Sequence, residues 1–375
     1  MIYLFSVILG IVEGLTEFLP VSSTAHLLLA QKVLQHSHPD LFVDRGYWDM
    51  YTVVIQLGAI LCLPIYFWDR IMRFLKTFPQ GERGDKTIWT HPLTLVLVAF
   101  VVTAGPAFLL KKIVKNNLEK PQVWGTALLV GGIAMWVVDV VCTRRFNKAA
   151  KKGSRNAFEA GGATAAIARG TPVTGVAAAL NPAATVLDYE DAKAAKAVGF
   201  HHTEHIEEMN LVQAIWIGAC QILSAVFPGT SRSMSTIASG QISGMSRESA
   251  LEFSFLLSIP TMTVATVFEG LKAVGLRKSS DGEAAPTINM TFEKWVVLII
   301  GFVVSFFVAW AVVAWFMGWV RKRGFTPFAV YRIILGTIVL ALAFKGVLTA
   351  EEEPSPPVHA PSAQVAPLQS ASPGK

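Results

Sequence analysis

The sequence has few charged residues, and the pattern of a cleavable leader is not seen at its N-terminus. Only 15% of its 375 residues are charged, whereas 53% are hydrophobic, and the mean hydropathy is positive. Several stretches approach the roughly 20 apolar residues that span a bilayer, so a soluble domain is excluded. The N-terminus shows neither a basic leader nor a small-residue cleavage site, and we expect it to be retained. The composition predicts an all-α, polytopic membrane protein.

Cysteines are also scarce, because the chain has only Cys62, Cys142 and Cys220. They lie far apart in apolar surroundings, which fits neither a disulfide framework nor a zinc site. The formal net charge is +6, but the basic residues flank apolar segments, as they do in cytoplasmic loops of membrane proteins. No nucleic-acid partner is therefore predicted.

Polar residues interrupt the first apolar stretch, residues 3–33. Glu13 and Glu17 share one face of a helix because they are four residues apart, and Pro20 then ends that helix. The polar residues that follow, where the next helix begins, are Ser22, Ser23, Thr24 and His26. Such groups are costly at membrane depth and are usually functional. We predict a re-entrant helical hairpin, since non-helical backbone is tolerated at this depth only beside protein or a wet cavity.

A second interrupted stretch, residues 211–242, repeats this pattern. The identical pairs at one constant offset are Gly10/Gly218, Leu15/Leu223, Pro20/Pro228 and Ser23/Ser231. At this offset Glu13 meets Gln221. In the same register Thr24 meets Arg232. Interrupted apolar segments at matching places in two halves indicate an inverted-topology repeat, with its site where the two breaks meet.

The other apolar stretches predict about six spanning helices. In a first membrane repeat, 1–142, they lie near 50–67, 92–110 and 123–142, and in a second repeat, 210–349, near 250–271, 295–319 and 327–348. Residues 143–209 are predicted to be a flexible Ala/Gly-rich linker, and residues 350–375 a disordered tail. His201, His202 and His205 close the linker, and a solvated linker end is favoured there over a metal site.

The distribution of basic residues predicts the topology. The loop at 70–86, the linker and the segment 321–323 fall on one side, which is the richer in Lys and Arg. That side is expected to be cytoplasmic. Both termini then face outward, and the two hairpins enter the membrane from opposite faces.

If the two breaks meet, acids and hydroxyls of the first face an arginine and hydroxyls of the second. The guanidinium of Arg232 is a planar fork suited to phosphate, and hydroxyls and free N–H groups at helix starts form an anion cradle. The candidate phosphate-binding residues are Ser22, Thr24, Thr230, Ser231, Arg232, Ser233 and Thr236. Glu13 and Glu17 would repel a phosphate unless a divalent cation lies between, or unless one of them accepts a proton. Ser23 or His26 could attack phosphorus while the other transfers protons.

Each feature also has a structural interpretation. Glu13 and Glu17 could form a polar pair at a helix contact, the hydroxyls could cap a helix, and Arg232 could simply pair with Glu17. Three further polar residues are assigned structural roles: a packing hydrogen bond for Gln56, an interfacial position for Glu252, and a snorkelling side chain for Arg332.

Several motifs together resemble one known family. They are residues 13–24 (EGLTEFLPVSST) with His26, residues 54–58 (VIQLG), residues 228–233 (PGTSRS) with Thr236, residues 252–257 (EFSFLL) and residues 327–332 (PFAVYR). These segments resemble the undecaprenyl-pyrophosphate phosphatases, also called bacitracin-resistance proteins. The resemblance covers nearly all of the chain outside the linker and the tail.

The resemblance implies a bacterial plasma-membrane enzyme that removes the terminal phosphate of a C55 isoprenoid pyrophosphate, which recycles the lipid carrier for cell-wall polymers. It also implies two re-entrant hairpins, a site open to the outer face and dependence on Mg²⁺ or Ca²⁺. By motif position, Glu13 and Glu17 are the acidic pair, Ser23 and His26 the candidate nucleophile and acid–base partner, and Arg232 the phosphate clamp. The sequence leaves open whether the protein forms a homodimer.

Two features depart from the family pattern. Ala25 stands where the family usually has glycine, which would strain the backbone if that position needs a positive φ. The linker is much longer than the family's loop, but a flexible loop of this length costs little entropy. The alternative function is an inverted-repeat transporter or flippase for an anionic polyprenyl phosphate. The enzyme is favoured because a transporter has no need of a nucleophile beside an imidazole.

Overall fold

The computed structural model describes residues 1–110, 120–167, 203–273 and 290–348, and within these ranges the chain is helical without a β-strand. The N-terminal half contains the helices α1 (Ile2–Thr16), α2 (Ser23–Ser37), η1 (Pro39–Phe42), α3 (Arg45–Tyr66), α4 (Trp68–Thr77), α5 (Pro92–Leu109) and α7 (Pro121–Ile167). The C-terminal half contains η2 (Ile206–Glu208), α9 (Leu211–Val226), α10 (Arg232–Ile242), α11 (Arg247–Ala273), α12 (Phe292–Arg323) and α13 (Thr326–Phe344).

Six of the described helices are long and apolar enough to cross a membrane: α3, α5, α7, α11, α12 and α13. They match the six predicted spans, which confirms the all-α membrane architecture. The apolar helices α1 and α9 are shorter, and each is followed by a break at the predicted proline. The long apolar runs therefore form a helical bundle, and the two breaks lie within it.

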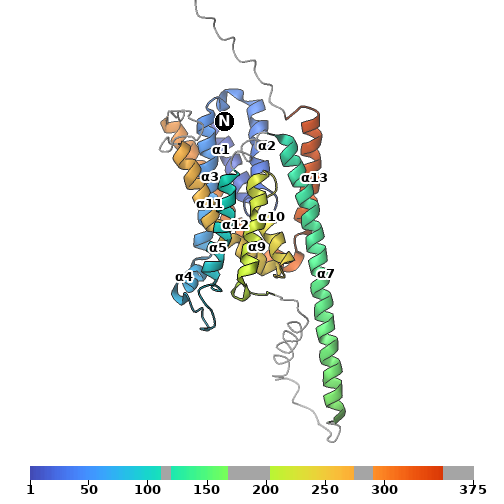
Figure 1. Cartoon of the computed structure of the whole chain (residues 1–375). Helices are drawn as coiled ribbons and strands as arrows, with labels where there is room; N and C mark the ends of the chain where they lie inside the picture. The colour runs from blue at the N-terminus through green and yellow to red at the C-terminus, as the bar shows by residue number, and fades with distance from the viewer. Residues whose placement is uncertain (111–119, 168–202, 274–289, 349–375) are drawn as a thin grey trace, which may run out of the picture.

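Two segments differ from the expected boundaries. The third span was expected to end near residue 142, but α7 continues as one helix of 47 residues and projects well beyond the bundle (Figure 1). The first part of the predicted linker, 143–167, is therefore helical, because its alanine-rich sequence has high helix propensity. The rest of that linker up to 202, including His201 and His202, and the predicted tail lie outside the described residues. The basic loop after α3 also contains a short helix, α4.

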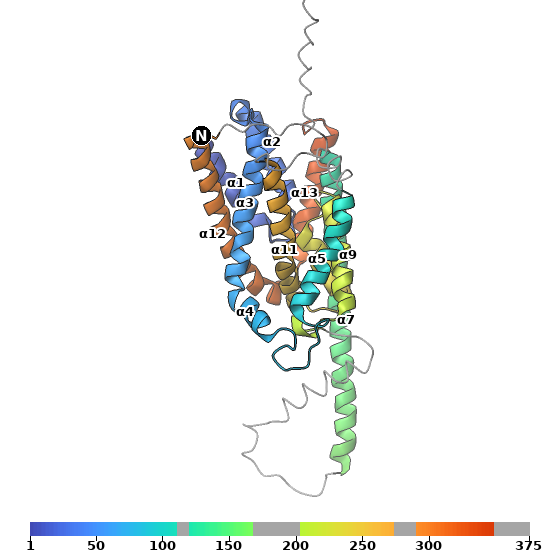
Figure 2. The same ribbon diagram turned by 60° about the vertical axis from the view of Figure 1, so that its left-hand side comes forward.

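The two halves pack in a reciprocal pattern. α1 packs on α12 of the other half, and α9 packs on α5 of the first half. In the same way α3 contacts α12, α11 contacts α5, and α7 pairs with α13. The two views show these neighbours side by side, with α1 starting at one end of the bundle and α9 at the other (Figures 1 and 2). This exchange of partners is the arrangement that an inverted repeat predicts.

Two anchors place the site inside this bundle. The ring of Phe18, in the turn after α1, is fully buried and meets Phe255 of α11 edge-on at 5.5 Å between centroids. Asp139 of α7 accepts hydrogen bonds from Arg247 Nε at 2.8 Å and from Thr326 Oγ1 at 3.0 Å. The first contact fixes the turn, and the second fixes where α13 begins.

Candidate functional site

The first turn joins α1 to α2. α1 ends at Thr16 with Glu17 as its C-cap, and Ser22 caps α2 by accepting a hydrogen bond from the Ala25 N–H at 3.5 Å. Ser22 has a φ of 75° and is only 3% exposed. Non-glycine residues rarely adopt a positive φ, and such strain collects at functional sites. The turn places Ser23 at the first position of α2.

The second turn joins α9 to α10 with the same cap. Ser231 has a φ of 72° and accepts a hydrogen bond from the Met234 N–H at 3.4 Å. Gly229 also has a positive φ, and a Cβ there would lie 2.7 Å from the carbonyl oxygen of Trp124. Only glycine fits so close to α7 in this conformation. The turn places Arg232 at the first position of α10.

The capping serines define which residues of the two turns correspond. Ser22 corresponds to Ser231, so Ser23 corresponds to Arg232. The constant sequence offset paired Thr24 with Arg232, and that pairing is wrong by one residue. The first turn has one residue between its proline and its capping serine, whereas the second has two. An alignment on the prolines hides this extra residue.

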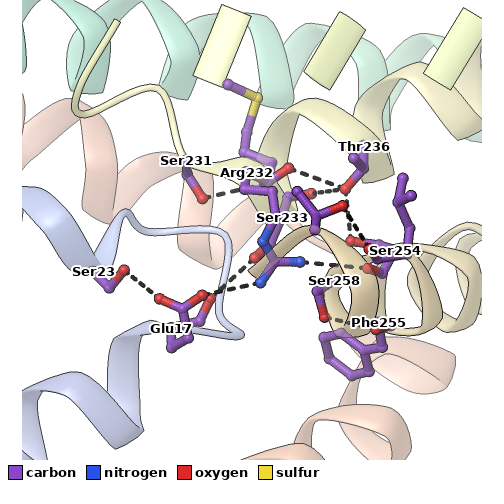
Figure 3. Close-up of polar contacts among 12 residues, drawn as sticks. Glu17, Ser23, Ser231, Arg232, Ser233, Thr236, Ser254, Phe255 and Ser258 are labelled. Atoms are coloured by element: carbon purple, nitrogen blue, oxygen red, sulfur yellow. Dashed lines mark hydrogen bonds and ion pairs between the residues drawn. The ribbon is translucent and has the colours of Figure 1, made fainter. Parts of the chain in front are cut away.

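Glu17 is the centre of a buried polar cluster (Figure 3). Ser23 Oγ donates a hydrogen bond to Glu17 Oε2 at 2.6 Å, and Arg232 Nη2 donates to Glu17 Oε1 at 3.1 Å. Ser233 Oγ donates to the Glu17 backbone carbonyl at 3.2 Å. The two turns therefore meet at this carboxylate, which contacts a hydroxyl from its own hairpin and a guanidinium from the other.

Arg232 is held from a second side by α11. Its Nη1 donates to the Ser254 carbonyl at 3.4 Å, and the Ser254 hydroxyl lies 2.6 Å from Thr236 Oγ1. The Arg232 side chain is 10% exposed, and its Nε has no hydrogen-bond partner among the described residues. A buried guanidinium with an unused donor is suited to an incoming anion. Ser254 was not predicted as a site residue, although it lies inside the 252–257 motif.

Glu13 lies one helical turn before Glu17 and is fully buried. Neither of its carboxylate oxygens has a hydrogen-bond partner within the described ranges. An unpaired buried carboxylate is costly, so these oxygens are suited to a cation or a proton. The described residues contain no group of three His, Cys, Asp or Glu that could hold a metal. Two carboxylates still fit Mg²⁺, which is usually bound by one or two carboxylates together with waters and phosphate oxygens.

His26 forms its hydrogen bonds with groups other than Glu13 and Glu17. Its Nδ1 lies 2.7 Å from the Ser22 carbonyl, and its Nε2 lies 2.7 Å from the Tyr331 hydroxyl. Because a carbonyl only accepts, Nδ1 carries the proton, and the Tyr331 hydroxyl donates to Nε2. The two rings also stack at 5.6 Å between centroids. Both ring nitrogens are thus engaged in this structure, and Tyr331 is a contact that the sequence analysis missed.

Arg332 was expected to snorkel toward the membrane interface, and this expectation is wrong. Its side chain is fully buried. Nη1 donates to the Pro20 carbonyl at 3.2 Å, and Nη2 donates to the carbonyls of Gly229 at 3.0 Å and Thr230 at 2.9 Å. Nη2 also reaches the Ala127 carbonyl at 3.2 Å. One guanidinium therefore contacts both turns.

Two other expectations have clear outcomes. Ala25 lies within α2 and has no positive φ, so alanine is not strained there; the strained position is Ser22. Glu252 is structural, because it forms an ion pair with Arg70 Nε at 2.7 Å. Of the predicted binding residues, Thr24 and Thr230 are half-buried beside the two caps.

Comparisons with known proteins agree with the motifs. The model of the family described as bacitracin resistance protein BacA matches residues 6–338. The chain is 50% identical over 343 residues to an undecaprenyl-diphosphatase of Koribacter versatilis, covering 92% of this chain and 99% of the relative. It is 32% identical over 347 residues to a protein of the same name from Deinococcus radiodurans, covering 92% and 97%. Together with the six apolar helices, these matches show a multi-pass membrane protein. The chain belongs to the bacitracin resistance protein BacA family.

Proposed function

We propose that this protein hydrolyses undecaprenyl pyrophosphate to undecaprenyl phosphate and inorganic phosphate. The relatives named undecaprenyl-diphosphatase match this chain over nearly their whole length. The observation that carries the proposal is the buried contact of Ser23 Oγ with Glu17 beside Arg232, at the meeting point of the two turns. A hydroxyl, an acceptor for its proton and a guanidinium are the groups that phosphoryl transfer requires.

The contacts favour Ser23 over His26 as the nucleophile. The Ser23 hydroxyl already donates to Glu17 Oε2 at 2.6 Å, whereas both His26 nitrogens are engaged elsewhere. Ser23 Oγ attacks the terminal phosphorus, Glu17 takes its proton, and the bond to the bridging oxygen breaks to release undecaprenyl phosphate. Water then attacks the phosphoserine, the proton on Glu17 returns to Ser23 Oγ, and inorganic phosphate leaves.

Arg232 orients the terminal phosphate and stabilises the charge that develops on its oxygens. The capping serines Ser22 and Ser231 and the hydroxyls of Ser233 and Thr236 shape the surrounding cradle. A diphosphate brings several negative charges beside Glu13 and Glu17, which one guanidinium does not offset. A divalent cation, Mg²⁺ or Ca²⁺, held by these two carboxylates would neutralise that charge and polarise the phosphate oxygens.

The proposed location is the bacterial inner membrane, with the active site open to the outer face and the long linker in the cytoplasm. The support is the excess of Lys and Arg on the side of α4 and of the segment 321–323. The buried turns support hairpins that re-enter the membrane, because backbone without helical hydrogen bonds must be covered by protein at that depth. The isoprenoid tail then stays in the bilayer while the diphosphate reaches the turns.

The test is phosphate release from undecaprenyl pyrophosphate by detergent-purified protein, with and without a chelator. Arg232→Ala and Ser23→Ala serve as the site variants, and Gly318→Ala serves as the control because a Cβ at Gly318 meets open space. We expect release by the wild type and the control, and its loss in both site variants and after chelation. A folded wild type that binds the lipid without releasing phosphate would overturn the proposal and favour the transporter.

A further inference from the structure

Arg332 occupies an unusual position for a charged side chain. It is fully buried, and its four hydrogen bonds all go to backbone carbonyls, those of Pro20, Ala127, Gly229 and Thr230. No carboxylate within the described ranges forms an ion pair with it. Burying a guanidinium without a counter-charge costs free energy. Stabilisation of the fold alone therefore does not explain why an arginine occupies this position.

Three of the four carbonyls that Arg332 contacts belong to the two breaks in the helical backbone, and the fourth, that of Ala127, lies in α7. Helix ends and turns leave carbonyls without intrahelical partners, and in a membrane these groups must be satisfied inside the protein. Pro20 lies in the turn after α1, and Gly229 and Thr230 lie in the turn after α9. Arg332 is thus a direct link between the turn that carries Glu17 and the turn that leads into Arg232.

We propose that Arg332 is a positioning residue that fixes the distance and orientation between the two turns. Ser23 follows Pro20 by three residues, and Arg232 follows Thr230 by two. A shift of one turn against the other would therefore separate the nucleophile from the phosphate clamp. The planar fork of arginine reaches both turns at once, and lysine has no equivalent geometry.

α7 is shaped to leave room for this guanidinium. A Cβ at Gly131 would overlap Arg332 Nη2 and would lie 2.9 Å from Cε at the flexible end of Met234, and a Cβ at Gly132 would lie 3.0 Å from Arg332 Cβ. Gly131 lies in the interior of a helix, where alanine is ordinarily the more stable residue. The glycine leaves space for the guanidinium of Arg332, which is the nearer neighbour, and for the terminal methyl group of Met234. Gly131→Ala therefore displaces the guanidinium without changing Arg332 itself.

The experiment compares Arg332→Lys, Gly131→Ala and the double variant with the wild type, with Gly105→Ala and Gly318→Ala as controls whose added methyl groups meet open space. Steady-state phosphate release gives kcat and KM, and size-exclusion chromatography gives the folded fraction. We expect each single variant to lower kcat at least tenfold with KM within threefold, while the controls match the wild type. Because Gly131→Ala acts through Arg332, it should add little in the Arg332→Lys background.

Hydrogen exchange followed by mass spectrometry provides a readout that does not depend on activity. Peptides covering residues 17–22 and 227–231 should both exchange faster in Arg332→Lys and Gly131→Ala, and neither should change in the controls. Faster exchange confined to α13, fully additive effects on kcat, or activity that falls only with the folded fraction would overturn the inference.

The inference uses the proposed function for its kinetic readout. A wild type that releases no phosphate defeats the proposed function, while the exchange data still decide whether Arg332 ties the turns. A wild type that releases phosphate at the same rate as Arg332→Lys defeats the role of Arg332 alone.

Discussion

The hairpin of α1 and α2 and the hairpin of α9 and α10 share a backbone plan but carry different side chains. Each turn ends in a buried capping serine with positive φ, Ser22 in one and Ser231 in the other. Each first helix packs on a helix of the opposite half. The first hairpin carries the acids Glu13 and Glu17, whereas residues 211–242 contain no carboxylate and a single arginine.

The position that corresponds to Glu13 at the constant offset is Gln221, which is also buried and lies 3.4 Å from the Thr261 hydroxyl through its Nε2. The two hairpins therefore divide the chemistry between them. In the proposed mechanism one hairpin provides the nucleophile and the two carboxylates, and the other provides the guanidinium of Arg232, which contacts Glu17. A repeated scaffold suits this division, because two matching turns meet at one point and each turn is free to change its side chains.

The largest expected effect is a difference in kcat between variants of Ser23 and of Ser231, the residue that matches Ser23 at the constant sequence offset. Ser23→Ala removes the proposed nucleophile and should lower kcat by about 10³-fold or more. Ser231→Ala should lower kcat far less, because Ser231 corresponds in the structure to the cap Ser22. Phosphate release by both purified variants tests this, with Ser22→Ala expected to behave like Ser231→Ala. Equal, large losses in Ser23→Ala and Ser231→Ala would contradict the correspondence drawn from the caps.

Replacing Glu13 by glutamine makes the first hairpin resemble the second at one position. Glu13→Gln gives that site the amide that Gln221 already has, and it removes a carboxylate from the proposed cation site. The Mg²⁺ concentration for half-maximal activity should rise by about tenfold or more, since affinity follows the charge of the ligands. Activity is measured against free Mg²⁺ after chelation and gel filtration. Gln221→Leu is the control, and an unchanged Mg²⁺ dependence in Glu13→Gln would show that Glu13 does not hold the cation.

Long-range features of the sequence predicted the scaffold well, for physical reasons. Spanning helices need long apolar runs, so the spans were visible. Pro64, Pro106 and Pro260 lie inside helices, and the two breaks were visible because Pro20 and Pro228 stand beside runs of hydroxyl residues. The boundary of α7 was missed because an alanine-rich segment has high helix propensity even where it has little surface to bury. The alignment of the two turns on their prolines was wrong by one residue at the capping serines. The second turn has one more residue between its proline and its capping serine than the first, and the sequence offset does not reveal it.

The site was less predictable where tertiary contacts decide the role of a residue. An arginine near the end of a span usually snorkels, and only the folded bundle brings the carbonyls of both turns to Arg332. The same holds for Tyr331, which meets His26 across 305 residues of sequence. The contacts of Glu17 with Ser23 and Arg232 bring predicted site residues together, and their catalytic roles stay predictions for the experiments above.

A smaller effect concerns how the two hairpins are attached to the opposite halves. A Cβ at Gly218 would lie 2.5 Å from the Ala99 carbonyl oxygen and 2.9 Å from Ala99 Cα. A Cβ at Gly10 would lie 2.9 Å from the Gly301 carbonyl oxygen and 3.1 Å from a side-chain atom of Val304. Both alanine variants should lose about 1–3 kcal/mol of stability. Gly218→Ala should lose more, because its contacts are closer and are all with backbone atoms, whereas two of the three at Gly10 are with the Val304 side chain.

Thermal unfolding in detergent measures this difference, with Gly318→Ala as the control. A larger loss in Gly10→Ala would mean that α1 is held more tightly against α12 than α9 is against α5, and the two attachments would then not be equivalent.

The smallest expected effect concerns the feature that the hairpins share, a capping serine with a positive φ. At Ser22 and Ser231 the hydroxyl caps the following helix, and a substitution to alanine should cost about 0.5–2 kcal/mol. Glycine also loses the hydroxyl, but it adopts a positive φ without strain, so Ser22→Gly and Ser231→Gly should each be more stable than the alanine variant at the same position. Thermal unfolding of the four variants gives the order of their stabilities.

Because both caps have nearly the same φ, 75° and 72°, the difference in stability between the glycine and alanine variants should be the same at both sites within error. A difference at only one site would show that the two turns store unequal strain, and the functional division between the hairpins would then extend to their backbones.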